Sequence, residues 1–440
     1  MTDKYINVIG AGLAGCEAAY QIAKRGVNVR LYEMKPIKKS PAHHTDNFAE
    51  LVCSNSLTAQ RTSSAAGLLK EEMRNLDSLL LRCADKCTVP AGGALAVDRD
   101  IFSSMVSEAI RSSDKIEVIS EEITAIPDDA ITVIATGPLT SDALCSDIAK
   151  LFGDSLSFFD AAAPIVTAES IDKETSFMQS RYDKGDGDDY INCPLNKAEY
   201  EEFYEALISA ERAPLHDFDV SDPKVYEGCM PIEVMAQRGQ DTIRFGPMKP
   251  VGLKDPRTGH RPWACLQLRR ENAQGTMYNL VGFQTNLKFP EQKRVFGMIP
   301  ALKNAEFVRF GVMHRNTFID SPRVLMGDYS AKCNNNLFFA GQLTGVEGYM
   351  ESASSGLMAG INAYNRLKEL DTLVLPQETM IGALARYITD ESITKFQPMG
   401  ASFGLLPELS NRPRDKKLRG EMYAQRSLDV LSCFIKERNV

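Results

Sequence analysis

The sequence predicts an α/β fold, a Rossmann-type, doubly wound parallel sheet with an inserted mixed α/β domain. A strand, a glycine turn, a helix and a second strand open the chain, and another glycine-rich strand-to-helix unit follows about 300 residues later. At 440 residues the chain also exceeds the usual size of one hydrophobic core. Two lobes are therefore expected, with the nucleotide-binding one built from both ends of the chain.

The first unit reads YINVIGAGLAGCEAAYQIAKRGVNVRLYEM and contains the pattern G-x-G-x-x-G between a strand and a helix. The first glycine permits the tight turn, the second lets a pyrophosphate approach the backbone, and the third lets helix and strand pack closely. The helix N-terminus faces the phosphates, and an acidic residue ending the second strand binds the ribose. The unit predicts a dinucleotide site built from Gly10, Ala11, Gly12, Leu13, Ala14, Gly15 and Glu33.

Two later stretches favour FAD over NAD at this site. ITVIATGPL (131–139) runs a strand into an Ala-Thr-Gly turn that can lie against an adenylate. LFFAGQLTGVEGYMESASSGLMAGINAYNRL (337–367) is a strand, a glycine-rich turn and a helix of small residues, which lets the backbone approach a flavin's ribityl phosphate. Close helix packing is the alternative reading of the same small residues. The two turns are expected to add Thr136, Gly137, Gly341, Gln342 and Gly348 to the cofactor site.

The order of these units indicates how the lobes divide. Residues 1–165 and 320–440 are expected to form the FAD-binding lobe, with residues 166–319 inserted as a lobe that faces the substrate and RNA. The chain can cross between the two lobes at Pro164, at a Gly/Asp-rich turn region and at Pro322.

Composition limits the class of protein. No apolar run approaches about 18 residues, so no membrane span is expected. The first residues lack a basic segment and an apolar signal core, which favours a cytoplasmic protein. The ten cysteines show no paired metal spacing, so no metal site is expected, and most thiols should be reduced, buried spacers. Nothing in the composition indicates an oligomeric state.

Charge is unevenly distributed although the net charge is -8. Residues 238–315 hold 14 Lys/Arg and five Asp/Glu, whereas residues 183–233 hold four and 14. A polyanion platform and a solvated surface with chance clustering both fit this pattern. In residues 250–270, Trp263 can stack on an RNA base or anchor the inserted lobe's core. The basic stretch 411–426 is a second patch or a solvated helix.

Cys53 lies in ELVCSNSL, within a long polar stretch between Glu33 and a helix expected to begin near Ser64. Such a long loop in a Rossmann lobe is more often functional than not. The short polar residues after the cysteine suit a turn or a helix start, and a helix N-terminus favours the thiolate. A buried spacer, a redox disulfide across the flavin and a Cys-His hydrolase are the alternatives; the nearest downstream cysteine, Cys83, is 30 residues away, which weakens the disulfide.

Two more candidates lie in or beside the lysine- and arginine-rich residues 238–315. Cys229 follows Gly228 in YEGCMPIEVMAQRG, near arginines that can attract an anionic substrate. His314, one of only five histidines, follows an apolar strand expected over residues 307–312; a structural histidine is the usual reading of such a position.

Seven motifs together resemble the folate- and FAD-dependent uridine-5-methyltransferases, the TrmFO family. They are GAGLAGCEAAYQIAKRG, AELVCSNS, ATGPLTS, YEGCMPIEVMAQRG, RFGPMKPVGL, MHRNTFI and AGQLTGVEGYMESASSGLMAG. The last is also similar to GidA (MnmG), a flavoprotein of wobble-uridine modification. The resemblance runs from Tyr5 to at least Asn365, and the motifs around Cys53 and Cys229 separate the chain from GidA.

The resemblance implies methylation of uridine C5 in the tRNA T-loop, forming ribothymidine. Its cofactors would be 5,10-methylenetetrahydrofolate, FAD and NADH or NADPH, and its partner the T-arm of tRNA. Cys229 would add to C6 as the nucleophile, while Cys53 would assist C5 deprotonation or protect the adduct. His314 would stack on the folate pterin. Three alternatives stay open: the same reaction on ribosomal RNA, a GidA-like wobble-uridine enzyme, and a flavin oxidoreductase of a small molecule.

Overall fold

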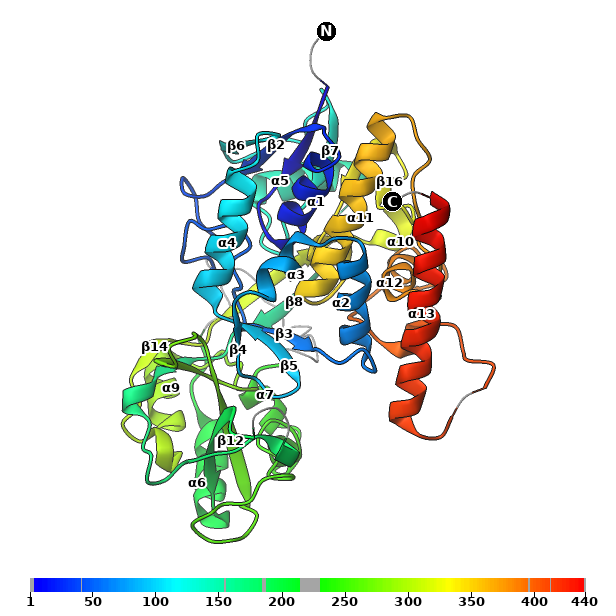
Figure 1. The fold of residues 1–440 in the computed structure, drawn as a ribbon. Coiled ribbons are helices and arrows are strands. Elements are labelled where there is room, and N and C mark those ends of the chain that lie inside the picture. The colour runs from blue at the N-terminus through cyan, green and yellow to red at the C-terminus, as the bar shows by residue number, and fades with distance from the viewer. Residues whose placement is uncertain are drawn as a thin grey trace.

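The structure, a computed structural model, consists of two lobes joined by a narrow central region (Figure 1). It describes residues 4–40, 42–153, 156–183, 187–213, 230–394, 396–411 and 413–438, with the backbone alone for residues 156–160, 183, 314 and 315. The N-terminal strands and the C-terminal helix share the upper lobe, whereas the middle of the chain builds the lower lobe.

A six-stranded sheet of order β16-β17-β7-β1-β2-β6 forms the upper lobe, and all its pairs except the edge pair β16–β17 are parallel. Apolar strands β1 and β7 are buried on both faces, as parallel strands covered by helices require. The sheet confirms the predicted doubly wound fold. Its strands are β1 (Tyr5–Ile9), β2 (Asn28–Glu33), β6 (Ile116–Ser120), β7 (Ile131–Ile134), β16 (Ser330–Ala331) and β17 (Asn334–Phe339).

Helices α1 (Leu13–Ala23) and α11 (Tyr349–Leu367) pack face to face. A Cβ at Gly356 would lie 2.1 Å from the carbonyl oxygen of Ala14, so only glycine permits this backbone approach. The other helices of the upper lobe are α2 (Ala65–Asn75), α3 (Leu79–Ala84), α4 (Arg99–Arg111), α5 (Asp142–Phe152), α10 (Ser321–Val324), α12 (Met380–Ile388) and α13 (Lys416–Arg438). Between the lobes lies a small sheet of β3 (Ser56–Ala59), β4 (Thr88–Val89) and β5 (Ala94–Val97).

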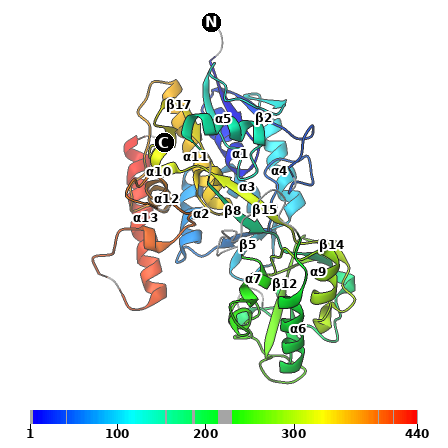
Figure 2. The same cartoon turned by 180° about the vertical axis from the view of Figure 1, so that it is seen from behind.

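The lower lobe contains a second six-stranded sheet, of order β10-β11-β12-β13-β9-β14, with antiparallel pairs and its own apolar core. Its strands are β9 (Ile165–Thr167), β10 (Phe177–Met178), β11 (Tyr190–Leu195), β12 (Ala264–Arg270), β13 (Met277–Leu280) and β14 (Phe307–Arg309). Its helices are α6 (Lys197–Ser209), α7 (Ile232–Ala236), α8 (Thr242–Phe245) and α9 (Phe289–Phe296). A ribbon of β8 (Leu156–Ala161) and β15 (Met313–Phe318) runs between the lobes (Figure 2).

One expectation needs correction, and two alternatives that the sequence left open are decided. The Ser-Asn-Ser sequence after Cys53 leads through a bend into strand β3 and starts no helix. His314 lies inside β15, because the strand expected over residues 307–312 ends at Arg309 and a new one begins at Met313. Trp263 is 36% exposed and therefore does not anchor the core of the lower lobe. The lobe boundaries near residues 165 and 320 stay a prediction, and no helix within the described ranges is long and apolar enough to cross a membrane.

Glu72 joins three helices at the side of the upper lobe. Its carboxylate, projecting from α2, accepts hydrogen bonds from the amides of Met380 (2.7 Å) and Ile381 (2.9 Å) at the start of α12. It also accepts one from the hydroxyl of Ser427 in α13 (2.5 Å). Burial raises the pKa of Glu72 to about 7, although these three donors favour the charged form.

We predict that Glu72 makes stability fall as pH rises. Its folded pKa of about 7 lies above the ordinary value of 4.5, so the unfolded chain loses this proton first. Wild type should therefore lose about 3 kcal/mol relative to Glu72→Gln between about pH 4.5 and 7. Thermal unfolding of both proteins across this range measures the difference. A constant difference between them would contradict the prediction.

Candidate active site

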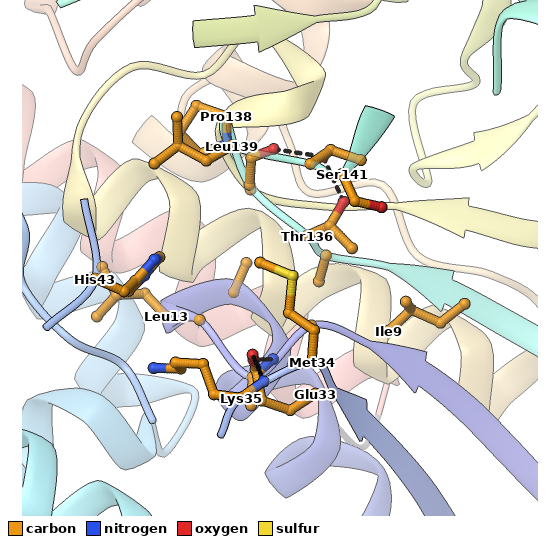
Figure 3. Close-up of a pocket in the computed structure, with 18 of the residues that line it drawn as sticks. Ile9, Leu13, Glu33, Met34, Lys35, His43, Thr136, Pro138, Leu139 and Ser141 are labelled. Atoms are coloured by element: carbon orange, nitrogen blue, oxygen red, sulfur yellow. Dashed lines mark hydrogen bonds between the residues drawn. The ribbon is translucent and has the colours of Figure 1, made fainter. Parts of the chain in front are cut away.

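A cavity that opens to solvent lies at the carboxyl ends of β1, β2 and β7, where open parallel sheets bind their ligands (Figure 3). Ten residues predicted for the cofactor line it: Gly10, Ala11, Gly12, Leu13, Ala14, Glu33, Thr136, Gly137, Gly341 and Gln342. Gly15 and Gly348 stand outside the lining.

The glycine turn is shaped to receive a ligand. Gly10 has φ +95°, and a Cβ there would lie 2.8 Å from the carbonyl oxygen of Ala135. Gly15 packs against the turn, since its Cβ would lie 1.7 Å from the carbonyl oxygen of Gly10. By contrast, Cβ positions at Gly12 and Gly137 meet no atom within 4 Å. Both turns therefore leave open space where a pyrophosphate or adenylate can approach the backbone.

Glu33 is buried at the end of β2. One carboxylate oxygen accepts a hydrogen bond from the amide of Ala11 (2.7 Å), and the other accepts one from the amide of Lys35 (3.0 Å). These two bonds fix the carboxylate beside the glycine turn (Figure 3). A carboxylate has about four acceptor positions, so two stay available for ribose hydroxyls. The geometry fits the dinucleotide predicted from the sequence.

Sequence reasoning missed several residues of the lining. Lys35 reaches the cavity and donates to the carbonyl of Asn47, and His43 faces the same space from the following loop (Figure 3). Burial, with the nearby Lys35 ammonium, lowers the pKa of His43. The unusual length of the loop after Glu33 could have indicated that its residues reach the cavity. Tyr349 also lines the cavity, and its position directly after Gly348 at a helix start could have identified it.

Cys53 differs from the structural cysteines. Five of the nine described cysteines are buried, namely Cys16, Cys83, Cys87, Cys193 and Cys265, and none of these nine is in a disulfide. Burial raises the pKa of Cys87 and of Cys265 to about 12, so these two are inert spacers. Cys53 is only half-buried, which separates it from this group.

The surroundings of Cys53 suit a reacting thiol. The backbone amides of Cys53 and Ser54 donate to the hydroxyl of Tyr349, at 2.8 and 3.2 Å. The Tyr349 side chain therefore touches both the cavity and residues 53–55, which we call the thiol loop. Burial, together with the nearby sulfur, raises the pKa of Tyr349, which keeps the phenol neutral. Arg99 and Arg309 interact electrostatically with Cys53.

The lower lobe holds this loop from the other side. Arg269 in β12 donates to the hydroxyl of Ser54 (2.7 Å) and to the side-chain oxygen of Asn55 (3.0 Å). The side-chain amide of Asn55 donates back to the carbonyl oxygen of Arg270 (2.8 Å). Arg269 and Asn55 are both buried, so these bonds are shielded from water. The thiol loop is therefore fixed jointly by both lobes.

The other predicted chemical residues are only partly described. Cys229 lies outside the described residues, and the side chain of His314 is not described. The chain after Cys229 is anchored, because the amide of Ile232 donates to the carbonyl oxygen of Gln284 (2.7 Å). Across the described ranges, no group of three His, Cys, Asp or Glu side chains is arranged to hold a metal ion.

Proteins similar in sequence to this chain are numerous. A protein named methylenetetrahydrofolate–tRNA-(uracil-5-)-methyltransferase TrmFO from Acetivibrio thermocellus is 59% identical over 432 residues, 98% of each chain. One with the same name from Brevibacillus brevis is 57% identical over the whole of both chains. The chain belongs to the TrmFO family. Residues 5–371 also match the family model described as glucose inhibited division protein A, GIDA.

The fold of this TrmFO-family chain is also found among solved structures. GidA from Aquifex aeolicus superposes with a TM-score of 0.69 over 98% of this chain and 74% of that one, at 16% identity. At this identity the likeness concerns the fold alone. The predicted relation of the TrmFO-like motifs to GidA is confirmed by the family model.

We predict that Arg269→Gln loosens the Cys53 loop. Ser54 and Asn55 would lose buried partners, each worth about 1–3 kcal/mol, so the loop should open more often. Alkylation of Cys53 by iodoacetamide, followed by peptide mass spectrometry, should become about fivefold faster or more. Exposed Cys333 is the internal reference, and Arg294→Gln in the lower lobe is the matched variant. Equal Cys53 rates in all three proteins would refute the role of Arg269.

Proposed function

We propose that the chain methylates C5 of a uridine in the T-loop of tRNA, forming ribothymidine, with 5,10-methylenetetrahydrofolate as carbon donor, FAD as cofactor and NADH or NADPH as reductant. The observation that carries the proposal is 57–59% identity over nearly the full length to proteins named for this reaction. The cavity lined by the glycine turns and Glu33, beside the Cys53 loop, supports it. A cytoplasmic location is part of the proposal, because unmodified tRNA is found there.

The reaction requires a thiol because uracil C5 is a poor nucleophile until something adds at C6. A thiolate suits this step, being soft, nucleophilic near neutral pH and able to leave again. We assign the addition to Cys229. Cys53 is assigned to removal of the C5 proton, since its half-buried position on a loop held by Tyr349 places it beside the cavity. His314 is assigned to stacking on the folate pterin.

The cofactor would be held by groups already present in the cavity. The amides of the Gly10–Gly12 turn would bind its pyrophosphate and Glu33 its ribose. When bound and reduced by NADH or NADPH, FAD supplies the two electrons that convert a methylene group into a methyl group. Tyr349 would keep the thiol loop against the cavity wall, because its hydroxyl accepts from the amides of Cys53 and Ser54.

We predict that FAD-loaded wild type forms labelled ribothymidine in unmodified tRNA transcript from labelled methylenetetrahydrofolate and NADPH or NADH, and that Cys229→Ser forms none. Mass analysis of the digested nucleosides measures the product. Cys433→Ser, which replaces an exposed thiol, is the matched control and should keep full activity. Product in ribosomal RNA but none in tRNA would contradict the substrate, and no product in either RNA would contradict the reaction.

We predict that Gly12→Asp abolishes FAD loading without unfolding the protein. A Cβ at Gly12 meets no protein atom, and aspartate at this N-cap position favours α1, so the fold should persist. The new carboxylate would repel the pyrophosphate, whereas Gly12→Asn adds the same bulk without charge. Flavin absorbance per purified protein should therefore fall at least tenfold further in the Asp variant than in the Asn variant. Equal loading of the two would refute a pyrophosphate at this turn.

A further inference from the structure

The lower lobe carries a surface of exposed aromatic side chains that the proposed chemistry does not use. Phe245 is 67% exposed, Tyr182 58% and Trp263 36%. All three belong to or contact the segment 242–263, which begins with helix α8 and ends directly before strand β12. We call Tyr182 and the segment 242–263 the aromatic face. Large aromatic side chains left this open to water usually mark a binding surface.

Arg244 links two of the rings. Its guanidinium carbon lies 3.9 Å from the ring centroid of Trp263 and 4.9 Å from that of Phe245, so the arginine contacts both rings. Its Nε donates to the carbonyl oxygen of Trp263 (3.1 Å), and its terminal nitrogen pairs with Asp241 (3.1 Å). Lys197 adds a second cation, 5.7 Å from the Trp263 ring. The rings are thus held in place and exposed rather than left as loose hydrophobic residues.

Tyr182 is fixed on the same segment. A Cβ at Gly252 would lie 3.0 Å from its ring carbon Cζ, so the ring rests directly on the glycine backbone. The neighbouring Arg181 donates to the carbonyl oxygens of Lys249 and Val251 and to Gln267 (2.7 Å). The loop and the tyrosine therefore form one ordered surface.

The aromatic face is basic within an acidic protein. Residues 242–263 contain five Lys/Arg and one Asp, whereas the chain as a whole has a net charge of -8. The single acid, Asp255, is buried and paired with Arg257 (2.7 Å). Lys249, Lys254 and Arg261 remain exposed. Exposed rings interleaved with cations are how proteins bind single-stranded or looped RNA, by stacking on bases and neutralising phosphates.

Strand β12 gives the distance from this face to the thiol loop. Trp263 directly precedes the strand, and Arg269 near its other end contacts Ser54 and Asn55. Six residues of extended chain span about 20 Å. An RNA whose uridine reaches the Cys53 loop must extend well beyond it, because neighbouring nucleotides and a stem come with the base.

We propose that the aromatic face binds the RNA substrate outside the modified uridine, with Phe245 and Trp263 stacking on nucleotide bases and Lys249 neutralising phosphate. The inference rests on the proposed function, which makes RNA the substrate. It gives the lower lobe a second RNA contact about 20 Å from the thiol loop.

Binding of fluorescently labelled, unmodified tRNA to the FAD-loaded protein tests the proposal. Phe245→Ser should weaken binding about 5- to 50-fold, whereas Phe245→Tyr, which keeps a stacking ring, should bind as wild type does. Lys249→Gln should reduce the slope of log Kd against log salt by about one, and Phe245→Ser should leave this slope unchanged. In ribothymidine formation the loss should appear in KM for tRNA rather than in kcat.

Arg294→Gln is the matched control for Lys249→Gln. It removes one exposed positive charge from helix α9 of the lower lobe, outside the aromatic face. If Phe245→Ser and Lys249→Gln bind tRNA as tightly as the control while wild type methylates it, the aromatic face has no role in RNA binding and a protein partner becomes the better occupant. If wild type neither binds nor methylates RNA, the proposed function itself fails, which is a different result.

Discussion

The close packing of α1 against α11 is the contact on which the rest of the molecule depends. It joins the N-terminal nucleotide motif to a segment more than 300 residues later, and it requires glycine, because a Cβ at Gly356 or Gly360 would collide with the backbone of α1. This packing sets where α11 begins. Tyr349, the first residue of that helix, thereby reaches both the cavity and the amides of the thiol loop. A packing constraint between two helices thus positions the Tyr349 hydroxyl, which in turn holds a third segment, the thiol loop.

Local patterns made the nucleotide half of the site predictable. In the first unit every contact that matters lies within 25 residues, so the strand, the turn, the helix and Glu33 could each be recognised from spacing. The same holds for the turns at Gly137 and Gly341, which line the cavity as expected. Gly348, also predicted for the cofactor site, lies at the N-terminus of α11 but does not line the cavity. A glycine in a turn indicates that another group approaches the backbone closely, but it does not show whether that group is a ligand or a neighbouring part of the protein.

The contacts that hold the Cys53 loop could not be predicted from the sequence. The partners that hold its loop, Tyr349 and Arg269, are 296 and 214 residues away from the groups they bind, and no local pattern records such pairs. The local structure after Cys53 also depended on distant residues. Ser-Asn-Ser suits a helix start as well as a bend, and pairing of β3 with β5 decided between them. His314 was misplaced because two short strands read as one apolar run.

Buried charge explains why the two lobes must dock in one arrangement. Arg99 of the upper lobe and Glu271 of the lower lobe pair at 3.0 Å, with side chains only 13% and 2% exposed. Arg269, also buried, is held by Ser54 and Asn55. Moving one lobe away would leave buried guanidinium and carboxylate groups without partners, at a cost of about 3–5 kcal/mol for the ion pair alone. An apolar junction could slide with little penalty. The charged junction cannot, so the thiol loop keeps one conformation only while the lobe that carries the aromatic face stays docked.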